Sequence, residues 1–280
     1  MRKNKVWFVT GASKGLGLAT VKKLLEQGYK VTATSRSIED LQQAVGKHDN
    51  FLPLEMDLLS ETAIQEAVEV TVNKFGSLDI IFNNAGYGQV GIFEEISDEL
   101  ARKNFDVNVF GTFNVIRNVL PQLRKQKYGH IFNTSSIGGY VGFPVSTIYN
   151  AAKFAVDGLT EALTHELTPL GIHVTSLKPG GFRTNFLSSG SLVWEDLSPS
   201  EDYDELRQKS KTNLGKNDHN QGGDPDKFAD LLIEMSQVEH PPLHLFVGED
   251  AYKLAENKID HIQKEMKVWK NPATSTGFDE

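Results

Sequence analysis

The sequence of 280 residues predicts an α/β fold, namely one domain built on a doubly wound parallel sheet of about seven strands. Three observations lead to this prediction. Short apolar runs alternate with longer amphipathic ones over the first two thirds of the chain, and a glycine-rich turn follows the first apolar run. The hydrophobic content of 39% is enough to bury a full core. Alternation of this kind implies parallel strands joined by right-handed crossovers.

The short apolar runs are the predicted strands, because each is brief and is bounded by polar or turn-forming residues. Pro179 stops the sixth of them. The predicted strands are Val6–Thr10, Lys30–Ser35, Phe51–Met56, Leu78–Asn83, His130–Thr134, His173–Leu177 and Leu243–Val247.

The amphipathic stretches between the strands are the predicted helices. Gly28 is placed to end the first helix. Ser60 and Asp224 are placed as N-caps of later ones, and Pro169 and Gly171 end the helix that precedes the sixth strand. The predicted helices are Leu16–Gln27, Ile38–Val45, Ser60–Phe75, a long one around Ala101–Gln126, Tyr149–Leu170 and Pro225–Met235.

The alternation breaks down after the sixth strand. Residues 188–224 are rich in Ser, Asp, Asn, Gly and Lys and contain few apolar side chains. This composition predicts a long loop or mobile lid, at about residues 186–224, and not a second domain. We therefore expect one domain over residues 1–270, with residues 271–280 as a disordered tail.

Composition excludes several classes of function. The net charge of −8 argues against a nucleic-acid or membrane-surface partner, which would need a basic face. The chain has no cysteine, which rules out disulfides, a thiolate nucleophile and a cysteine-based metal site. The eight histidines show no metal-ligand pattern, so we expect no metal. No apolar run is long enough to span a bilayer, and we expect a cytoplasmic enzyme.

A glycine-rich segment lies between the first strand and the first helix. Glycines there let the backbone turn sharply, so that its amides can approach a pyrophosphate at the helix N-terminus. Taken alone, such a cluster is also compatible with an ordinary strand-to-helix turn. Its spacing is G-x-x-x-G-x-G, in Thr10-Gly11-Ala12-Ser13-Lys14-Gly15-Leu16-Gly17.

The end of the second strand bears on the choice of nicotinamide cofactor. An enzyme that prefers NAD usually has Asp or Glu there, to accept hydrogen bonds from the adenosine ribose. Here Thr34, Ser35 and Arg36 occupy the position, and no acid appears before Glu39. Arg36, together with Lys14 of the glycine-rich turn, can pair with a 2′-phosphate. The sequence therefore favours NADP(H) over NAD(H).

Tyr149 and Lys153 are four residues apart within one predicted helix, so they share one face of it. A nearby ammonium favours the phenolate and is expected to lower the pKa of Tyr149. Tyr149 can then protonate a carbonyl oxygen as a hydride arrives, or deprotonate an alcohol in the reverse direction. A Tyr-x-x-x-Lys pair by itself is more often a feature of an exposed helix face.

Four ordered segments together resemble the short-chain dehydrogenase/reductase family, in its shorter single-domain branch with a Rossmann fold. They are the T-G-x-x-x-G-x-G turn, Asn83-Asn84-Ala85-Gly86, Tyr149-x-x-x-Lys153 and Pro179-Gly180. The segments around Tyr87–Gly91 and Phe182 look most like those of hydroxysteroid and retinol dehydrogenases. The resemblance implies an NADP(H)-dependent oxidoreductase that acts on a carbonyl or secondary alcohol.

The resemblance also assigns roles to individual residues. It implies that Ser136 hydrogen-bonds the substrate oxygen, that Asn108 holds a water in a proton relay, and that Lys153 holds the nicotinamide ribose. Asp57 resembles the acid that hydrogen-bonds the adenine amino group. The predicted catalytic residues are thus Asn108, Ser136, Tyr149 and Lys153. The predicted cofactor-binding residues are Gly11, Ser13, Lys14, Gly15, Leu16, Gly17, Arg36, Asp57, Leu58, Asn84, Ala85, Gly86, Tyr149, Lys153, Pro179, Gly180 and Thr184.

Two serines compete for the position at the end of the fifth strand. Strand alternation sends the side chains of Ser135 and Ser136 to opposite faces, so only one of them can serve the substrate. By resemblance, the separation of thirteen residues from Tyr149 favours Ser136.

The predicted substrate wall is largely apolar and includes the segment from Ile137 to Val145. Such a wall suits a hydrophobic ketone, aldehyde, or steroid-like or retinoid-like molecule. A sugar-nucleotide epimerase is disfavoured because the chain is too short for the substrate domain of those relatives. A non-catalytic NADP(H)-binding regulator remains the alternative. Relatives pair through the helices that here are Ala101–Gln126 and Tyr149–Leu170, so the resemblance implies a homodimer or homotetramer.

Overall fold

A computed structural model of the chain describes residues 5–188, 191–195 and 197–278. Within these residues, seven parallel strands form one sheet in the order β3-β2-β1-β4-β6-β7-β9. The prediction of a doubly wound parallel sheet is confirmed. The strand bounds are β1 (Val6–Thr10), β2 (Lys30–Ser35), β3 (Phe51–Glu55), β4 (Ile80–Asn83), β6 (Gly129–Thr134), β7 (Ile172–Pro179) and β9 (His244–Val247).

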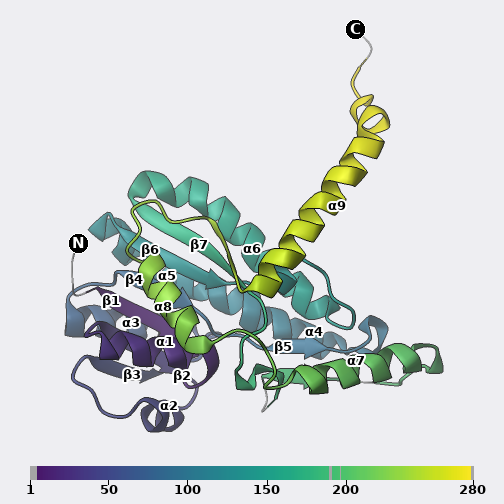
Figure 1. The fold of residues 1–280 in the computed structure, drawn as a ribbon. Coiled ribbons are helices and arrows are strands. Elements are labelled where there is room, and N and C mark those ends of the chain that lie inside the picture. The colour runs from purple at the N-terminus through teal and green to yellow at the C-terminus, as the bar shows by residue number, and fades with distance from the viewer. Residues whose placement is uncertain (1–4, 189–190, 196, 279–280) are drawn as a thin grey trace.

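Helices cover both faces of the sheet (Figure 1). One face packs against α1 (Gly15–Glu26), α2 (Ile38–Val45) and α8 (Pro225–Met235). The other face packs against α3 (Glu61–Phe75), α5 (Gly111–Gln126) and α6 (Thr147–Leu167). Neighbouring strand residues alternate between the two cores, because successive side chains of a strand point to opposite faces. In β1, Trp7 and Val9 enter the first core and Phe8 enters the second.

The strand order reverses direction between β1 and β4, which lie side by side. Crevices for ligands form at such switch points, outside the carboxyl ends of the strands. The turn after β1 and the segment after β4 meet there. The predicted site residues follow β1, β2, β3, β4, β6 and β7, so the topology gathers them at one edge of the sheet.

Local capping agrees with the sequence at most helix ends. The side chain of Ser60 accepts a hydrogen bond from the amide of Ala63, and Asp224 caps α8 by accepting from the amide of Asp226. Gly28 follows α1 with a φ of 81°, a conformation that glycine adopts at little cost. Gly171 adopts a similar left-handed conformation, with a φ of 73°, after the short turn that follows α6.

The long helix expected around Ala101–Gln126 is interrupted in the structure. It consists of α4 (Asp98–Phe105), a π-helical segment over Asp106–Phe110, and α5. Apolar periodicity does not distinguish a π-helical turn from a regular one, so the break could not be predicted from the residue pattern. Such turns are common at functional sites, and this one contains Asn108.

The segment expected to be a loop or lid contains regular structure. It includes β8 (Leu192–Trp194), which pairs with β5 (Gly88–Val90), and the 14-residue helix α7 (Asp204–Asn217). The side chains of α7 itself are mostly polar on every side of the helix. The helix therefore lacks the apolar stripe by which helices are recognised in a sequence. An ion pair of 2.8 Å between Arg207 of α7 and Glu95, both at most 7% exposed, holds the helix to the body. Movement of this segment as a lid stays a prediction.

A final helix, α9 (Glu249–Thr274), has no counterpart among the predicted elements. It stands away from the body in Figure 1. Residues 271–274, which were expected to begin a disordered tail, continue this helix. None of the helices in the described ranges combines the length and apolarity needed to cross a membrane.

Candidate active site

Tyr149 and Lys153 lie one turn apart on α6, where this helix meets the carboxyl end of β6. Lys153 is 4% exposed, and its Nζ donates a hydrogen bond of 2.7 Å to the carbonyl oxygen of Thr134. The same Nζ lies 5.8 Å from the centre of the Tyr149 ring. Burial lowers the pKa of Lys153 from 10.5 to about 8, because loss of water disfavours the charged ammonium. Lys153 is therefore still mostly protonated at neutral pH.

Ser136 hydrogen-bonds the side chain of Tyr149. Burial raises the pKa of the Tyr149 hydroxyl above its ordinary value, and the hydrogen bond with Ser136 offsets only part of that rise. The direction expected from the sequence, a lowering by the Lys153 ammonium, is wrong for this structure. Its physical reason is that loss of solvent dominates, while the ammonium is directed to the Thr134 carbonyl. The phenol consequently keeps its proton at neutral pH.

Ser135 points the other way, as strand alternation predicts. Its Oγ donates a hydrogen bond of 2.9 Å to the backbone carbonyl of Lys153. Gly139 packs against this contact, and a Cβ there would lie 2.1 Å from Ser135 Oγ and 2.7 Å from the Lys153 carbonyl oxygen. Ser135 thus ties the backbone of α6 to the end of β6, and Ser136 is the serine placed beside Tyr149. The catalytic role of Ser136 stays a prediction.

Asn108 is buried in the π-helical segment and is bonded to the backbone that follows β4. Its Oδ1 accepts from the amide of Tyr87 at 3.1 Å, and its Nδ2 donates to the Tyr87 carbonyl at 3.0 Å. A Cβ on Gly86 would lie 2.4 Å from Asn108 Oδ1 and 3.4 Å from Lys153 Nζ. Asn108 and Lys153 therefore meet at Gly86, where only a glycine fits between them.

Asn150 was missed by the sequence analysis, although it neighbours Tyr149. It is buried, its Oδ1 accepts from the amide of Phe143, and its Nδ2 donates to the carbonyl of Gly138. These bonds fasten the apolar loop before α6 to the helix itself. The only signal in the sequence is an amide side chain on the buried side of a predicted helix.

The glycine-rich turn is clamped to the segment after β4. Nδ2 of Asn84 donates to the carbonyls of Thr10 and Gly11, at 3.1 Å and 3.0 Å. Thr10 Oγ1 accepts from the amides of Asn84 and Ala85. Gly11 has a φ of 64°, and a Cβ on it would lie 2.7 Å from Ala85 Cα. Thr10, which the sequence analysis did not select, is the acceptor that joins the two segments.

The N-terminal end of α1 fits a phosphate group. Gly15 has a φ of 59°, and a Cβ on it would meet nothing closer than Thr184, at 3.9 Å. Leu16 and Gly17 follow in the first turn of α1, which contains no acidic residue. The positive end of the helix dipole and its amides favour an anion there. The backbone therefore leaves room beside Thr184 for the pyrophosphate of a dinucleotide.

The ends of β2 and β3 lie beside the glycine-rich turn. Ser35 Oγ donates to Ser13 Oγ at 3.3 Å, and the adjacent Arg36 is exposed, as is Lys14. Asp57 is exposed and accepts a hydrogen bond of 2.9 Å from the amide of Leu59.

Leu58 is anchored from the side of α5. The Leu58 carbonyl accepts a hydrogen bond of 2.9 Å from Asn114 Nδ2. A Cβ added to Gly111 would lie 2.9 Å from the Cβ of Leu58. This contact positions the turn that carries Asp57 against the start of α5.

The turn after β7 is held by a residue from α9. Asp250 Oδ2 accepts from the amide of Gly181 at 2.7 Å. A Cβ on Gly180 would lie 2.2 Å from Asp250 Oδ1, so Pro179 can be followed there only by glycine. Thr184 Oγ1 accepts from the amide of Phe186. The sequence offers no signal for Asp250, because it is 69 residues away and belongs to an unpredicted helix.

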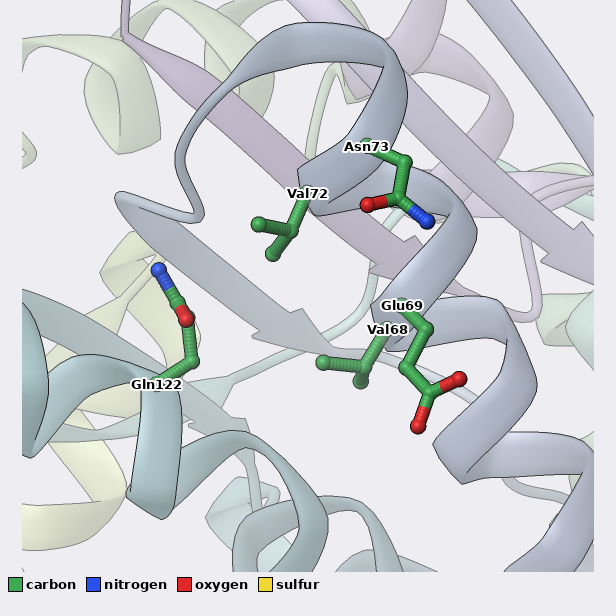
Figure 2. Close-up of a pocket in the computed structure, with 5 residues that line it drawn as sticks. All are labelled: Val68, Glu69, Val72, Asn73 and Gln122. Carbon is green, nitrogen blue, oxygen red and sulfur yellow. The ribbon is translucent and has the colours of Figure 1, made fainter.

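A shallow hollow on the surface lies apart from these residues. It is formed between α3 and α5, and Figure 2 shows the side chains of these two helices that line it. The lining contains no histidine, serine, lysine or tyrosine that could carry chemistry. The residues are Val68, Glu69, Val72, Asn73 and Gln122.

Comparison with known proteins finds one family along most of the chain. Residues 5–191 match the model of the short chain dehydrogenase family. Oxidoreductase BOA17 of Botryotinia fuckeliana is 35% identical over 268 residues, which cover 95% of this chain and 97% of that protein. The 3-ketodihydrosphingosine reductase of Bacteroides thetaiotaomicron is 34% identical over 244 residues, covering 87% of this chain and 88% of that one.

Solved structures are similar over nearly the whole fold. A short-chain dehydrogenase from Streptomyces avermitilis has a TM-score of 0.89 at 31% identity, covering 99% of this chain and 100% of that one. The 3-ketoacyl-(acyl-carrier-protein) reductase from Brucella melitensis, complexed with NADH, has a TM-score of 0.72 at 26% identity, covering 88% and 97%. ElxO with NADP bound has a TM-score of 0.71 at 25% identity, covering 87% and 97%. Proteins similar to this chain therefore bind either nicotinamide cofactor.

The contact at Gly139 predicts a large difference between two glycine substitutions in the same loop. Gly139→Ala would force a methyl group into Ser135 and the Lys153 backbone, and should lower the free energy of unfolding by about 1–3 kcal/mol. Gly142→Ala is the matched control, because its Cβ would meet nothing within 4 Å. Urea denaturation measures both variants. Equal stability of the two would contradict the packing described for Ser135.

The lowered pKa of Lys153 predicts a pH-dependent stability. Between pH 8 and 10.5 the unfolded chain binds the Lys153 proton and the folded chain releases it. The free energy of unfolding should therefore rise with pH in this window, relative to a Lys153→Met variant that has no such proton. Urea denaturation of both proteins at several pH values checks the trend. A difference that stays constant with pH would show that Lys153 is not desolvated.

Proposed function

The chain belongs to the short-chain dehydrogenase/reductase family and is an NAD(P)-dependent oxidoreductase, and we propose that it reduces the carbonyl group of an apolar small molecule with NADPH. One observation carries this proposal. Tyr149 is a partly buried, protonated phenol that is bonded to Ser136 and lies one turn from the buried Lys153. A residue of this kind can hand a proton to a substrate oxygen.

Tyr149 acts as the general acid. A bound nicotinamide would supply a hydride to the carbonyl carbon, and the carbonyl oxygen would then need a proton. Because burial raises its pKa, Tyr149 holds that proton at neutral pH and can release it to the oxygen. Ser136 donates a hydrogen bond to the same oxygen and so polarises the carbonyl group. Alcohol oxidation would instead need the phenolate, which burial disfavours, so we propose reduction as the working direction.

Lys153 supplies Tyr149 with a replacement proton after Tyr149 has protonated the substrate oxygen, and water then reprotonates Lys153. A lysine whose pKa is about 8 can give up a proton near neutrality more readily than an ordinary lysine. Asn108 meets Lys153 at Gly86 and keeps its predicted place in a proton relay. Lys153 also holds the nicotinamide ribose, as the family resemblance implies.

NADP(H) is the proposed cofactor because of the residues after β2. Arg36 is exposed at the end of that strand and can bind a 2′-phosphate through two parallel hydrogen bonds. The next acids along the sequence, Glu39 and Asp40, lie in the first turn of α2, where Ser37 is the N-cap. Lys14 is exposed in the glycine-rich turn and adds positive charge on the same side. The glycine-rich turn itself accommodates either cofactor.

An apolar ketone or aldehyde is the proposed substrate. The ring of Phe186 lies 6.2 Å from the ring of Tyr149, and Tyr140, Val141 and Phe143 form a partly buried apolar cluster before α6. These residues suit a steroid-like, retinoid-like or long-chain carbonyl compound. The relative named 3-ketodihydrosphingosine reductase supports a ketone on a long apolar chain.

A homodimer or homotetramer is proposed through the face formed by α5 and α6. Phe110, just before α5, is 51% exposed, and Phe154 of α6 is 40% exposed. The rings of Phe110 and Phe113 contact each other at 5.8 Å. Exposed aromatic clusters of this kind mark protein interfaces. The cytoplasmic location stays a prediction from the sequence.

Replacing Tyr149 tests the proposed reaction. Tyr149→Phe removes the proton donor, so kcat for carbonyl reduction should fall by about 10²-fold or more, whereas the affinity for NADPH should change little. Tyr29→Phe is the control, because that ring packs on Trp7 at the amino end of the strands, away from Ser136. Oxidation of NADPH is followed by absorbance with a panel of apolar ketones and aldehydes. Binding of NADPH without turnover of any carbonyl by the unaltered protein would favour the regulatory alternative.

Replacing Arg36 tests the cofactor preference. Arg36→Ala removes a charge-assisted contact and should weaken NADPH binding by about 10–100-fold, while NADH binding stays nearly unchanged. Arg124→Ala, an exposed arginine in the last turn of α5, is the control. Fluorescence titration with each cofactor measures the dissociation constants. Tighter binding of NADH than of NADPH by the unaltered protein would contradict the assignment.

A further inference from the structure

The outer part of α9 is a helix without cover from its own chain. Its first turns are anchored by the buried Ala251 and Ala255 and by Lys258, whose Nζ lies 4.9 Å from the centre of the Phe154 ring. From Ile259 to Phe278 every residue is exposed. We call residues 259–274 the arm, and Figure 1 shows it projecting from the body.

The arm carries an apolar stripe on one side. Ile259, Ile262, Met266 and Trp269 are 42%, 37%, 67% and 65% exposed. Their spacing of three, four and three residues is that of a coiled-coil seam. The spacing is the same when it is read from either end of the helix. Two copies running in opposite directions can therefore place every stripe residue against a stripe residue.

The polar side of the arm supports the helix but does not cover the stripe. Lys264 pairs with Asp260 at 2.6 Å, and His261 pairs with Glu265 at 3.4 Å, each one turn apart. Such pairs contribute only about 0.2–0.5 kcal/mol each. An unsupported helix of this length is marginal in water, so packing of the stripe against another surface would supply the missing stability.

The distribution of charge along α9 favours an antiparallel arrangement with a second copy of the same helix. Residues 249–262 carry four carboxylates and two lysines, whereas residues 263–274 carry three lysines and one carboxylate. The inner half is thus acidic and the outer half is basic. An antiparallel pair of these helices places each acidic half beside a basic half, and a parallel pair places like charges together.

We propose that the arm binds the α9 helix of a second copy of this chain, in an antiparallel pair. This contact is self-complementary, as a twofold interface must be. It is centred on residues 259–274 of α9 and adjoins the exposed aromatic face of α5 and α6, because Lys258 of α9 lies over the Phe154 ring. Two different twofold contacts assemble a tetramer, whereas one alone gives a dimer. The inference does not depend on the proposed reaction.

Substitutions on the stripe test the contact. The double variant Ile262→Glu with Met266→Glu should halve the assembly mass measured by sedimentation equilibrium, and should leave NADPH binding unchanged. Asn257→Glu is the matched control, because that residue is exposed on the other side of α9, and it should keep the mass of the unaltered protein. Circular dichroism verifies that each variant folds. An unaltered protein that is monomeric, or a stripe variant of unchanged mass, would overturn the proposal.

Charge reversal tests the orientation. Lys267→Glu with Lys270→Glu sets acid against acid in an antiparallel pair, so the assembly should weaken at least tenfold at low salt and recover in part at high salt. In a parallel pair, Lys267 and Lys270 of one copy lie beside the same two residues of the other copy. The substitutions would then replace one like-charge contact with another and leave the assembly unchanged. An unchanged assembly would therefore overturn the orientation. Binding to vesicles of phosphatidylcholine and phosphatidylserine is measured in parallel. Vesicle binding that the stripe variant loses, with no change in mass, would assign the stripe to a membrane and overturn the proposal.

Discussion

The site depends on one contact, the attachment of α6 to the end of β6 through Lys153. Its Nζ donates to the Thr134 carbonyl at 2.7 Å, and its own carbonyl accepts from Ser135 Oγ at 2.9 Å. These two hydrogen bonds run in opposite directions between the end of β6 and α6. Together they hold α6 in its rotation about its own axis and in its position along that axis relative to β6. Only with α6 in this position does Tyr149 meet Ser136. Burial of the contact sets the protonation of both Tyr149 and Lys153.

A second buried pair holds α6 further along its length. Lys178 of β7 is fully buried and binds Asp157 of α6 at 2.5 Å. Its Nζ also contacts His244 Nδ1 of β9 at 2.8 Å. Asp157 lies one turn beyond Lys153, and Lys178 directly precedes the Pro179 turn. This pair links the helix that carries Tyr149 to the turn that begins at Pro179.

Much of this arrangement could be predicted from the sequence, because it rests on local patterns. The strands, most helices and the spacing of Tyr149 and Lys153 follow from periodicity, and the glycines mark a turn. The contacts of Thr134 and Asp250 could not be predicted, since one uses a backbone carbonyl and the other joins residues far apart in the chain. The helix α7 could not be predicted because its sequence has no apolar stripe. The direction of the shift in the Tyr149 pKa depends on how much water the fold excludes, and this cannot be inferred from a pattern of residues.

The central claim is that burial keeps Tyr149 protonated, and a spectroscopic titration tests it most directly. Phenolate absorbance in the ultraviolet is followed against pH for the unaltered protein and for a Tyr149→Phe variant, and the difference reports this one tyrosine. The account predicts that Tyr149 ionises above the ordinary value of 10.0. Ionisation well below that value in the folded, cofactor-free protein would contradict it, because burial would then not favour the protonated phenol.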